Sequence, residues 1–311
     1  MDPELAALTA MSPRLDISDV QSARAISQGL QAALVATEVD EEWAELVDWA
    51  DGPLALEDGR SIPARVYRPV MRNELSPGLV FFHGGGFVMG DLEQEHSRCT
   101  RLAAEATCIV VSVDYRLAPE HPFPEPFDDC YLALKAVVSA AKELEINATR
   151  LAVGGSSAGA GLAAAVALKA RDEGGPEIAF QLLIYPALDD RMSTPSMLHL
   201  TEAPGWDARQ CRLMWGHYLG GHPTSVSPYA APARASDVSG LPPAYIMTAE
   251  LDPLRDEGIT YAMRLAQAGV STELHLFAEA FHGFDLAVSS AEISRRALGE
   301  QAYALRVALR P

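Results

Sequence analysis

Short runs of apolar residues recur along most of the chain, and each has the length of a β-strand. The first two, residues 54–56 and 62–67, flank an Asp-Gly turn at residues 58–59, which is a strong signal for a hairpin. Six more runs follow, at residues 79–82, 109–113, 151–153, 182–185, 244–247 and 273–277. These six alternate with helical segments, and such alternation predicts a mainly parallel sheet covered by helices on both faces.

Five segments between or after these runs show helical periodicity, at residues 98–107, 128–145, 157–171, 256–268 and 291–309. Two parts of the chain do not follow this alternation of strands and helices. Residues 1–50 are interpreted as helices with no strand between them, and residues 191–222 crowd methionine and aromatic side chains together. We predict that these two parts form a helical cap, and that residues 51–190 and 223–311 form the α/β core.

Composition limits the partners of such a domain. The 311 residues carry a formal net charge of −18 at pH 7, which argues against nucleic acid because neutralising phosphates requires clustered Lys and Arg. The first residues lack the basic and apolar regions of a secretory signal, and the apolar stretch at residues 158–168 is too short to span a bilayer. We therefore expect a soluble cytoplasmic protein. Its four cysteines show no CxxC spacing, so neither a zinc site nor a redox dithiol is predicted.

The strongest chemical signal is Gly-Ser-Ser-Ala-Gly at residues 155–159, after an apolar strand and before a helix-forming run. This is the pattern of a nucleophile elbow, in which a serine occupies a sharp turn from strand to helix. Glycines two residues before and after the serine avoid a collision with neighbouring backbone. Only Ser157 has glycine on both sides at that spacing, so we prefer it to Ser156 as nucleophile. Taken alone, the motif is also compatible with a Gly-Ser turn without chemistry.

A second motif, His-Gly-Gly-Gly at residues 83–86, follows the strand predicted at 79–82. Such a turn leaves backbone N–H groups unobstructed beside the top of the sheet. In an ester hydrolase these groups hold the oxyanion of the tetrahedral intermediate. We predict an oxyanion hole formed by Gly84 and Gly85 together with Ala158 at the start of a helix, where the dipole also helps.

A serine nucleophile needs a base and an orienting acid, and in this fold the acid precedes the histidine in the chain. Asp252 follows the strand at 244–247, and His282 follows the strand at 273–277. Active-site side chains belong at these carboxyl ends of strands. We predict His282 as general base and Asp252 as the acid, with Asp256 and Glu250 as rival acids.

Several motifs in this order resemble those of the hormone-sensitive-lipase-like esterases, the bacterial family IV branch of the α/β hydrolases. They are residues 83–86, 114–120, 155–159, 252–258 and 282–284. The resemblance implies an eight-stranded sheet, a helical cap built from the N-terminal residues and the 192–221 insertion, no cofactor, and hydrolysis of short to medium acyl esters. Two departures stand out: the family usually has Asp at the position of Ser156 and Gly at the position of Ala160. Residues 115, 116 and 120 are interpreted as a structural turn.

These observations predict a serine carboxylesterase that works through an acyl-enzyme. The same triad would serve an amide, lactone or thioester substrate, and a small-molecule receptor on a hydrolase scaffold is a further alternative. The cap side chains Trp206, Met214, Trp215 and Tyr218 are interpreted equally well as a substrate pocket or as ordinary cap core. We also expect a homodimer through the last strand, residues 273–277, on the habit of the family and the strand's expected place near a sheet edge.

Overall fold

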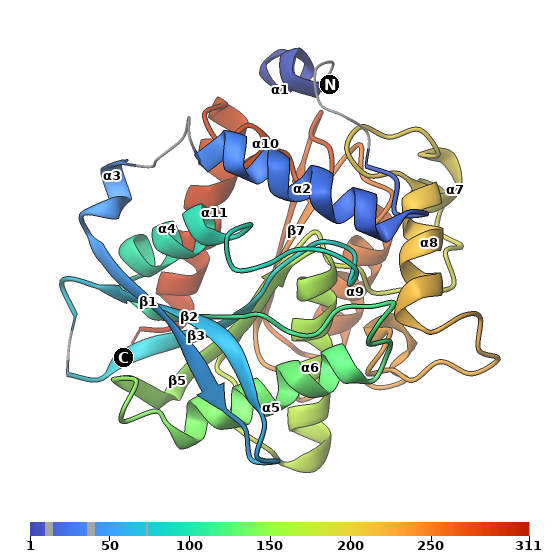
Figure 1. The fold of residues 1–311 in the computed structure, drawn as a ribbon. Coiled ribbons are helices and arrows are strands. Elements are labelled where there is room, and N and C mark those ends of the chain that lie inside the picture. Colours follow the sequence, from blue (N-terminus) through green and yellow to red (C-terminus); the bar gives the residue numbers. More distant parts are fainter. Residues whose placement is uncertain (10–14, 36–40, 73, 311) are drawn as a thin grey trace.

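An eight-stranded sheet forms the centre of the computed structural model, which describes residues 1–9, 15–35, 41–72 and 74–310 (Figure 1). Its strands are β1 (Val47–Ala55), β2 (Ser61–Pro69), β3 (Ser76–Phe82), β4 (Ile109–Val113), β5 (Ile146–Ser156), β6 (Phe180–Ile184), β7 (Ala244–Ala249) and β8 (Thr272–Phe277). They lie in the order β1-β2-β4-β3-β5-β6-β7-β8. Strand β2 is antiparallel to β1 and β4, and the other neighbours are parallel. The predicted sheet is confirmed.

Helices cover both faces of this sheet (Figure 1). They are α1 (Pro3–Thr9), α2 (Val20–Val35), α3 (Glu41–Ala44), α4 (His96–Ala106), α5 (Glu125–Ser139), α6 (Ala158–Glu173), α7 (Pro195–His199), α8 (Ala208–Tyr218), the 3₁₀ helix η1 (Pro232–Arg234), α9 (Arg255–Gln267), α10 (Phe284–Ala287) and α11 (Glu292–Ala308). Because side chains alternate along a strand, Val80 and Phe82 join a core with α5, α6 and α9, while Leu79 and Phe81 join a second core with α4 and α11.

Two of the boundaries that differ from the sequence prediction change the extent of the sheet. Strand β1 begins at Val47, so the sheet already starts within residues 1–50, which were expected to be helical. The helix expected over residues 128–145 ends at Ser139. Glu145 adopts a left-handed φ of 62°, which turns the chain into β5, where Ile146 pairs with Ser76 of β3.

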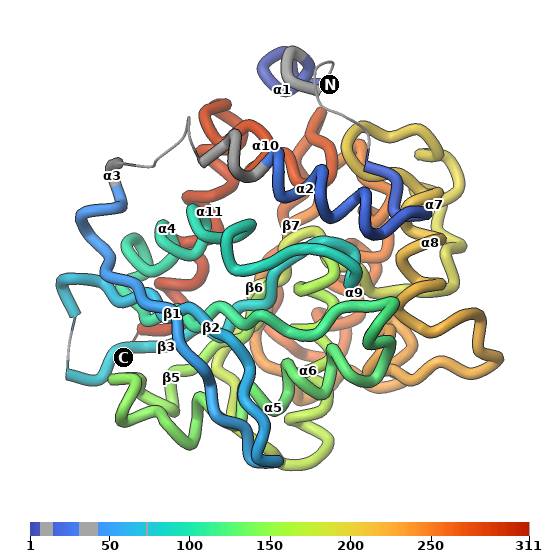
Figure 2. Tube along the Cα trace, viewed as in Figure 1, coloured from blue at the N-terminus to red at the C-terminus, as the bar shows by residue number. Residues whose placement is uncertain are grey.

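The N-terminal segment contacts the 191–222 insertion and the loops after β3 and β4. The Ile17 N–H donates to Gln210 Oε1 at 3.1 Å, and His217 Nε2 lies 3.0 Å from the Ile17 carbonyl oxygen. Arg24 of α2 donates to the carbonyl oxygens of Val88 and Ala118. The trace in Figure 2 follows these parts, which are distant in sequence, to the same side of the molecule. Residues 10–14 and 36–40 of the N-terminal part lie outside the described residues.

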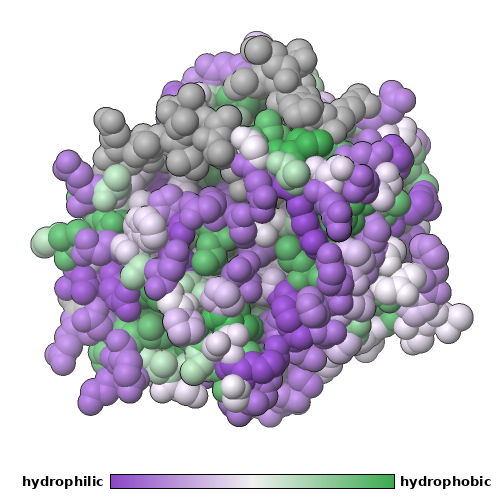
Figure 3. All heavy atoms as spheres, in the orientation of Figure 1, coloured by the Kyte–Doolittle hydropathy of each residue, from purple (hydrophilic) through white to green (hydrophobic). Residues whose placement is uncertain are grey.

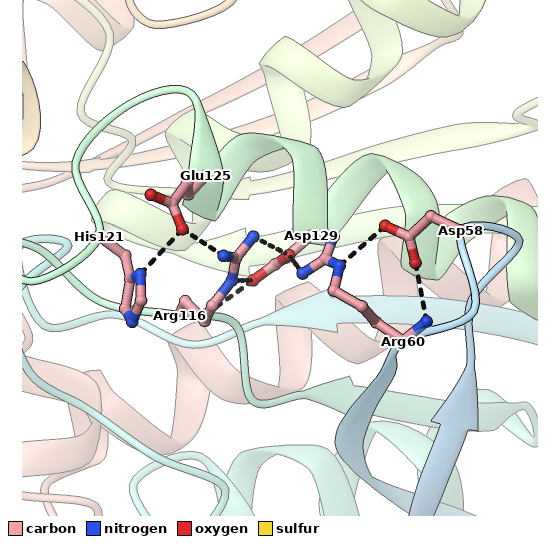
Figure 4. A network of polar contacts seen from close by, with 6 residues as sticks. All are labelled: Asp58, Arg60, Arg116, His121, Glu125 and Asp129. Carbon is pink, nitrogen blue, oxygen red and sulfur yellow. Dashed lines mark hydrogen bonds and ion pairs between the residues drawn. The ribbon is translucent and has the colours of Figure 1, made fainter.

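A polar network ties the β1–β2 hairpin to α5 and to the loop after β4 (Figure 4). Asp129 of α5 has no exposed surface and accepts from Arg60 of the hairpin and from Arg116 after β4. Arg116 also contacts Glu125, which accepts in turn from His121. The network anchors the segment that begins at residue 114, as expected for a structural turn.

The surface is mainly polar on the side that Figure 3 presents. Hydrophobic residues there lie in small separate groups among hydrophilic ones. Within the described part of the chain, no helix combines the length and apolar character that crossing a bilayer requires.

Candidate active site

Ser157 occupies a strained turn between β5 and α6. Its φ is 54° and its ψ is −116°, in a region that residues other than glycine rarely adopt. Its N–H donates to the Ile184 carbonyl oxygen at 2.8 Å. A Cβ atom at Gly159 would lie 2.0 Å from the Phe82 carbonyl oxygen, and one at Gly155 would lie 2.5 Å from the Gly159 carbonyl oxygen. The two glycines therefore meet the steric demand that the sequence motif predicts.

The structure brings Ser157, Asp252 and His282 together from three separate loops. His282 Nε2 lies 2.9 Å from Ser157 Oγ, and His282 Nδ1 lies 2.7 Å from Asp252 Oδ2. The rival acids have other partners: Asp256 accepts from the Ser196 N–H, and Glu250 accepts from the Glu279 N–H. The predicted convergence of the three side chains is therefore present, with Asp252 rather than its rivals beside the imidazole.

The surroundings of Asp252 fix the donor and the acceptor in both hydrogen bonds of His282. Asp252 is fully buried, and its other carboxylate oxygen accepts from the Leu254 N–H at 2.8 Å. An ionised carboxylate only accepts, so the imidazole donates from Nδ1 and its Nε2 is left to accept from the Ser157 hydroxyl. The Tyr185 ring lies 4.7 Å from the His282 ring between centroids and limits its rotation. The arrangement can remove a proton from the serine.

The glycine turn after β3 carries N–H groups beside this site. The Gly84 N–H donates to Glu95 Oε1 at 3.4 Å, which counts against Gly84 as an oxyanion donor. Among the described residues, the N–H groups of Gly85, Gly86 and Ala158 donate to no protein acceptor. They are the donors that remain available.

Two contacts hold the backbone just before this turn. The Tyr115 hydroxyl donates to the His83 carbonyl oxygen at 2.8 Å, and the two rings stack at 4.2 Å. The turn therefore rests on the buried Tyr115 of the loop that follows β4, whose residues 115, 116 and 120 were predicted to be structural. Sequence reasoning identified that loop but not its contact with the glycine turn.

The four cap side chains divide into two pairs. A Cβ at Gly86 would lie 2.8 Å from Trp206 Cη2 and 3.5 Å from Met214 Cγ, and the Trp206 ring lies 6.3 Å from the His282 ring. Trp206 and Met214 thus border the site. Trp215 and Tyr218 instead pack on the Phe87 ring, at 5.8 and 3.8 Å between centroids, and belong to the cap core.

Sequence reasoning missed three buried residues behind the site: Glu95, Arg98 and Tyr185. Arg98 is 1% exposed and donates to Glu95, to Asp285 and to the Tyr185 hydroxyl. The one sequence signal, an acidic and a basic residue three positions apart, is typical of a solvent-exposed helix. Nothing in the sequence indicates that this pair is buried.

Comparison with known proteins identifies the family. A family model described as the alpha/beta hydrolase fold matches residues 79–286. Esterase LipI of Mycobacterium tuberculosis is 39% identical over 310 residues, which cover 98% of this chain and 94% of that relative. Carboxylesterase NlhH of the same species is 45% identical over 228 residues, covering 72% of this chain and 71% of that relative. The solved structure titled Bacterial Heroin Esterase superposes with a TM-score of 0.94 at 45% identity, covering 100% of this chain and 98% of the other. The chain therefore belongs to the α/β-hydrolase-fold family, in its hormone-sensitive-lipase-like branch of carboxylic ester hydrolases.

Proposed function

We propose that this protein is a serine carboxylesterase in which Ser157 is the nucleophile, His282 the general base and Asp252 the orienting acid. The observation that carries the proposal is the position of His282, which bridges Ser157 at 2.9 Å and Asp252 at 2.7 Å. Relatives named as esterases and carboxylesterases support the same reaction class.

The reaction has two halves. In the first, Ser157 Oγ attacks the acyl carbonyl carbon while His282 Nε2 takes the hydroxyl proton. Asp252 stabilises the imidazolium and stays ionised. The tetrahedral intermediate then collapses, the alcohol leaves with the proton from His282, and the acyl group remains on the serine as an ester. Water repeats the sequence in the second half and releases the carboxylic acid.

The oxyanion of both intermediates is held by backbone N–H groups. We assign Gly85 and Ala158 to this role, with Gly86 in the place predicted for Gly84, because the Gly84 N–H already has Glu95 as acceptor. Ala158 is also the first residue of the 16-residue helix α6, and the positive end of its dipole favours a negative charge there. Removing one such donor typically costs ~10² to 10³ in rate.

The proposed substrates are esters of short to medium acyl chains. The N-terminal segment and the 191–222 insertion contact each other, and we propose that they form a cap over the site. Trp206 of the insertion lies beside both Gly86 and His282. A bulky ring at this point limits the room for an acyl chain next to the nucleophile.

Two substitutions and one matched control test the assignment with p-nitrophenyl butyrate as substrate. Ser157→Ala should abolish turnover and labelling by a fluorophosphonate, which reacts with an activated serine. Asp252→Asn should lower kcat by ~10⁴ because it fixes the wrong imidazole tautomer. Asp256→Asn makes the same chemical change at the rival acid and should keep kcat within a few-fold of wild type. A Ser157→Ala variant with wild-type turnover would disprove the nucleophile.

A substrate panel then separates the ester from other acyl donors. Rates measured with p-nitrophenyl esters from acetyl to palmitoyl, and with matched amides, lactones and thioesters, should be highest for short to medium esters. Preference for an amide, lactone or thioester would keep the triad and overturn the substrate class. A receptor without an activated serine would show neither turnover nor stoichiometric covalent labelling by the fluorophosphonate.

A further inference from the structure

The carboxylate of Glu95 is buried where the elbow meets the glycine turn. Glu95 precedes α4 and is 1% exposed. The Ser156 hydroxyl and the Gly84 N–H both donate to its Oε1 atom, the latter at 3.4 Å. Arg98 Nε donates to the other oxygen at 2.8 Å. One carboxylate thus accepts from three donors on three different segments.

These donors stand next to the reacting groups of the proposed esterase. Ser156 immediately precedes the nucleophile in the chain, and Gly84 immediately precedes the proposed oxyanion glycines. The two are themselves close, because a Cβ at Gly84 would lie 2.8 Å from Ser156 Oγ. We propose that Glu95 is a positioning residue, whose carboxylate fixes the nucleophile elbow and the oxyanion turn relative to each other.

The carboxylate is held rigidly because its counter-ion is also fixed. Arg98 is buried, and besides Glu95 it donates to Asp285 at 2.8 Å and to the Tyr185 hydroxyl at 2.9 Å. A buried charge without such partners would be strongly unfavourable. Tyr185 in turn contacts the His282 ring. The same buried network therefore touches the elbow, the oxyanion turn and the histidine.

A neutral amide cannot replace this carboxylate. A glutamine has one acceptor oxygen and one donating NH₂ group, yet it would face three donors at position 95. In one amide orientation the NH₂ group faces Ser156 and Gly84, so the elbow or the turn must shift. In the other it faces Arg98, so the side chain at position 95 that holds both segments must shift. Misplacing reacting groups by about 1 Å can cost ~10²-fold in rate. Substrate affinity should change little, because Glu95 accepts from Ser156, Gly84 and Arg98, and none of these is a side chain that we place beside the acyl chain.

The first experiment compares Glu95→Gln with Glu93→Gln. Glu93 lies two residues away, pairs with Arg65 at 2.6 Å and has a half-exposed side chain, so this variant makes the same chemical change outside the network. With p-nitrophenyl butyrate we expect Glu95→Gln to lower kcat by roughly 10- to 100-fold with KM within about threefold of wild type. Glu93→Gln should keep the wild-type kcat. Active-site titration with a fluorophosphonate corrects each kcat for the folded fraction.

The second experiment moves the carboxylate from position 95 to position 156. In Ser156→Asp/Glu95→Gln the carboxylate lies at position 156, and the NH₂ group at position 95, in the place of Oε1, can donate to it while the amide oxygen accepts from Arg98. We expect this double variant to recover at least tenfold of the kcat that Glu95→Gln loses. Ser156→Asp alone places two carboxylates in contact and should lower kcat.

The outcomes separate this inference from the proposed function on which it rests. If Ser157→Ala is inactive but Glu95→Gln has wild-type kcat per titrated site, the positioning role is wrong and the esterase stands. A lower melting temperature with unchanged kcat, or a double variant no better than Glu95→Gln, also overturns the role. Should Glu95→Gln fail to fold, Ser156→Ala removes one donor only and must lower kcat by roughly 5- to 10-fold.

Discussion

Replacing Gly159 by alanine tests the close packing between the elbow and the end of β3. A methyl group at this position would lie 2.0 Å from the Phe82 carbonyl oxygen and 2.4 Å from the His83 carbonyl oxygen. Ordinary contact begins at 3.4 Å, and both obstacles are backbone atoms that cannot rotate away. The start of α6 and the end of β3 must therefore separate by about 1 Å or more.

This separation would divide the proposed site. The nucleophile and the Ala158 N–H move with α6, whereas Gly85 and Gly86 follow His83 at the end of β3. A displacement of about 1 Å can cost ~10²-fold in rate, and overpacking typically costs about 1–3 kcal/mol of stability. We expect Gly159→Ala to lower kcat/KM at least ~100-fold and the free energy of unfolding by about 3 kcal/mol.

Initial rates with p-nitrophenyl butyrate and urea unfolding followed by circular dichroism measure the two effects. Gly29→Ala is the matched control, since it adds the same methyl group within α2, where nothing lies within 4 Å. Alanine favours a helix interior by roughly 0.5–1 kcal/mol over glycine, and kcat/KM should stay at the wild-type value. A Gly159→Ala variant with kcat/KM within twofold of wild type and an unchanged urea midpoint would refute this packing.

Three further predictions concern stability, acyl-chain preference and assembly. Burial raises the pKa of Asp129, but hydrogen bonds from Arg116 and Arg60 outweigh it and hold that pKa below its ordinary value. The carboxylate therefore stabilises the fold above about pH 4, and this contribution is lost as the pH falls through the folded-state pKa. Asp129→Asn should lower the Tm at pH 7 much more than at pH 3, and equal losses would contradict this. Trp206→Ala should raise the ratio of kcat/KM for octanoyl over acetyl esters about tenfold, and an unchanged ratio would remove Trp206 from the acyl pocket. Leu276 is 48% exposed on the edge strand β8, so Leu276→Lys should convert a dimeric mass in light scattering into a monomeric one, and a monomeric wild type would exclude this interface.

The order and nature of the strands could be predicted because each is a compact apolar run bounded by turn residues. The six runs from residue 79 onward all lie within observed strands except for Tyr185, one residue past β6. Helix ends were harder to predict. Residues 140–145 have helical composition, but pairing of Ile146 with Ser76 requires the chain to turn at Glu145. A tertiary contact sets this boundary, and local sequence does not contain it.

The residues of the candidate site could likewise be predicted only in part. The convergence of Ser157, Asp252 and His282 was predictable because strand ends in a parallel sheet lie at one edge, so motifs after β5, β7 and β8 must meet there. Sequence alone distinguishes the oxyanion donors that we propose only to within one residue. Three consecutive glycines look equivalent in sequence, and what distinguishes Gly84 from Gly86 is an acceptor, Glu95, that comes from another segment.

Position 156 shows why a departure from a family pattern cannot be interpreted without its partner. The sequence indicates that Ser156 replaces a usual aspartate, which would suggest that a carboxylate has been lost beside the nucleophile. In the structure the Ser156 hydroxyl donates to Glu95, 61 residues earlier in the chain. A carboxylate is therefore present beside the nucleophile, but it comes from the residue that precedes α4.

Glu95 and Arg98 have the spacing of an exposed helical ion pair, which is worth only a few tenths of a kcal/mol. Their burial changes the consequence: removing Arg98 leaves the buried Glu95 without its counter-ion, and an unpaired buried charge typically costs about 3–5 kcal/mol. The local pattern is identical in both settings, and only the packing of α4 against the sheet distinguishes them.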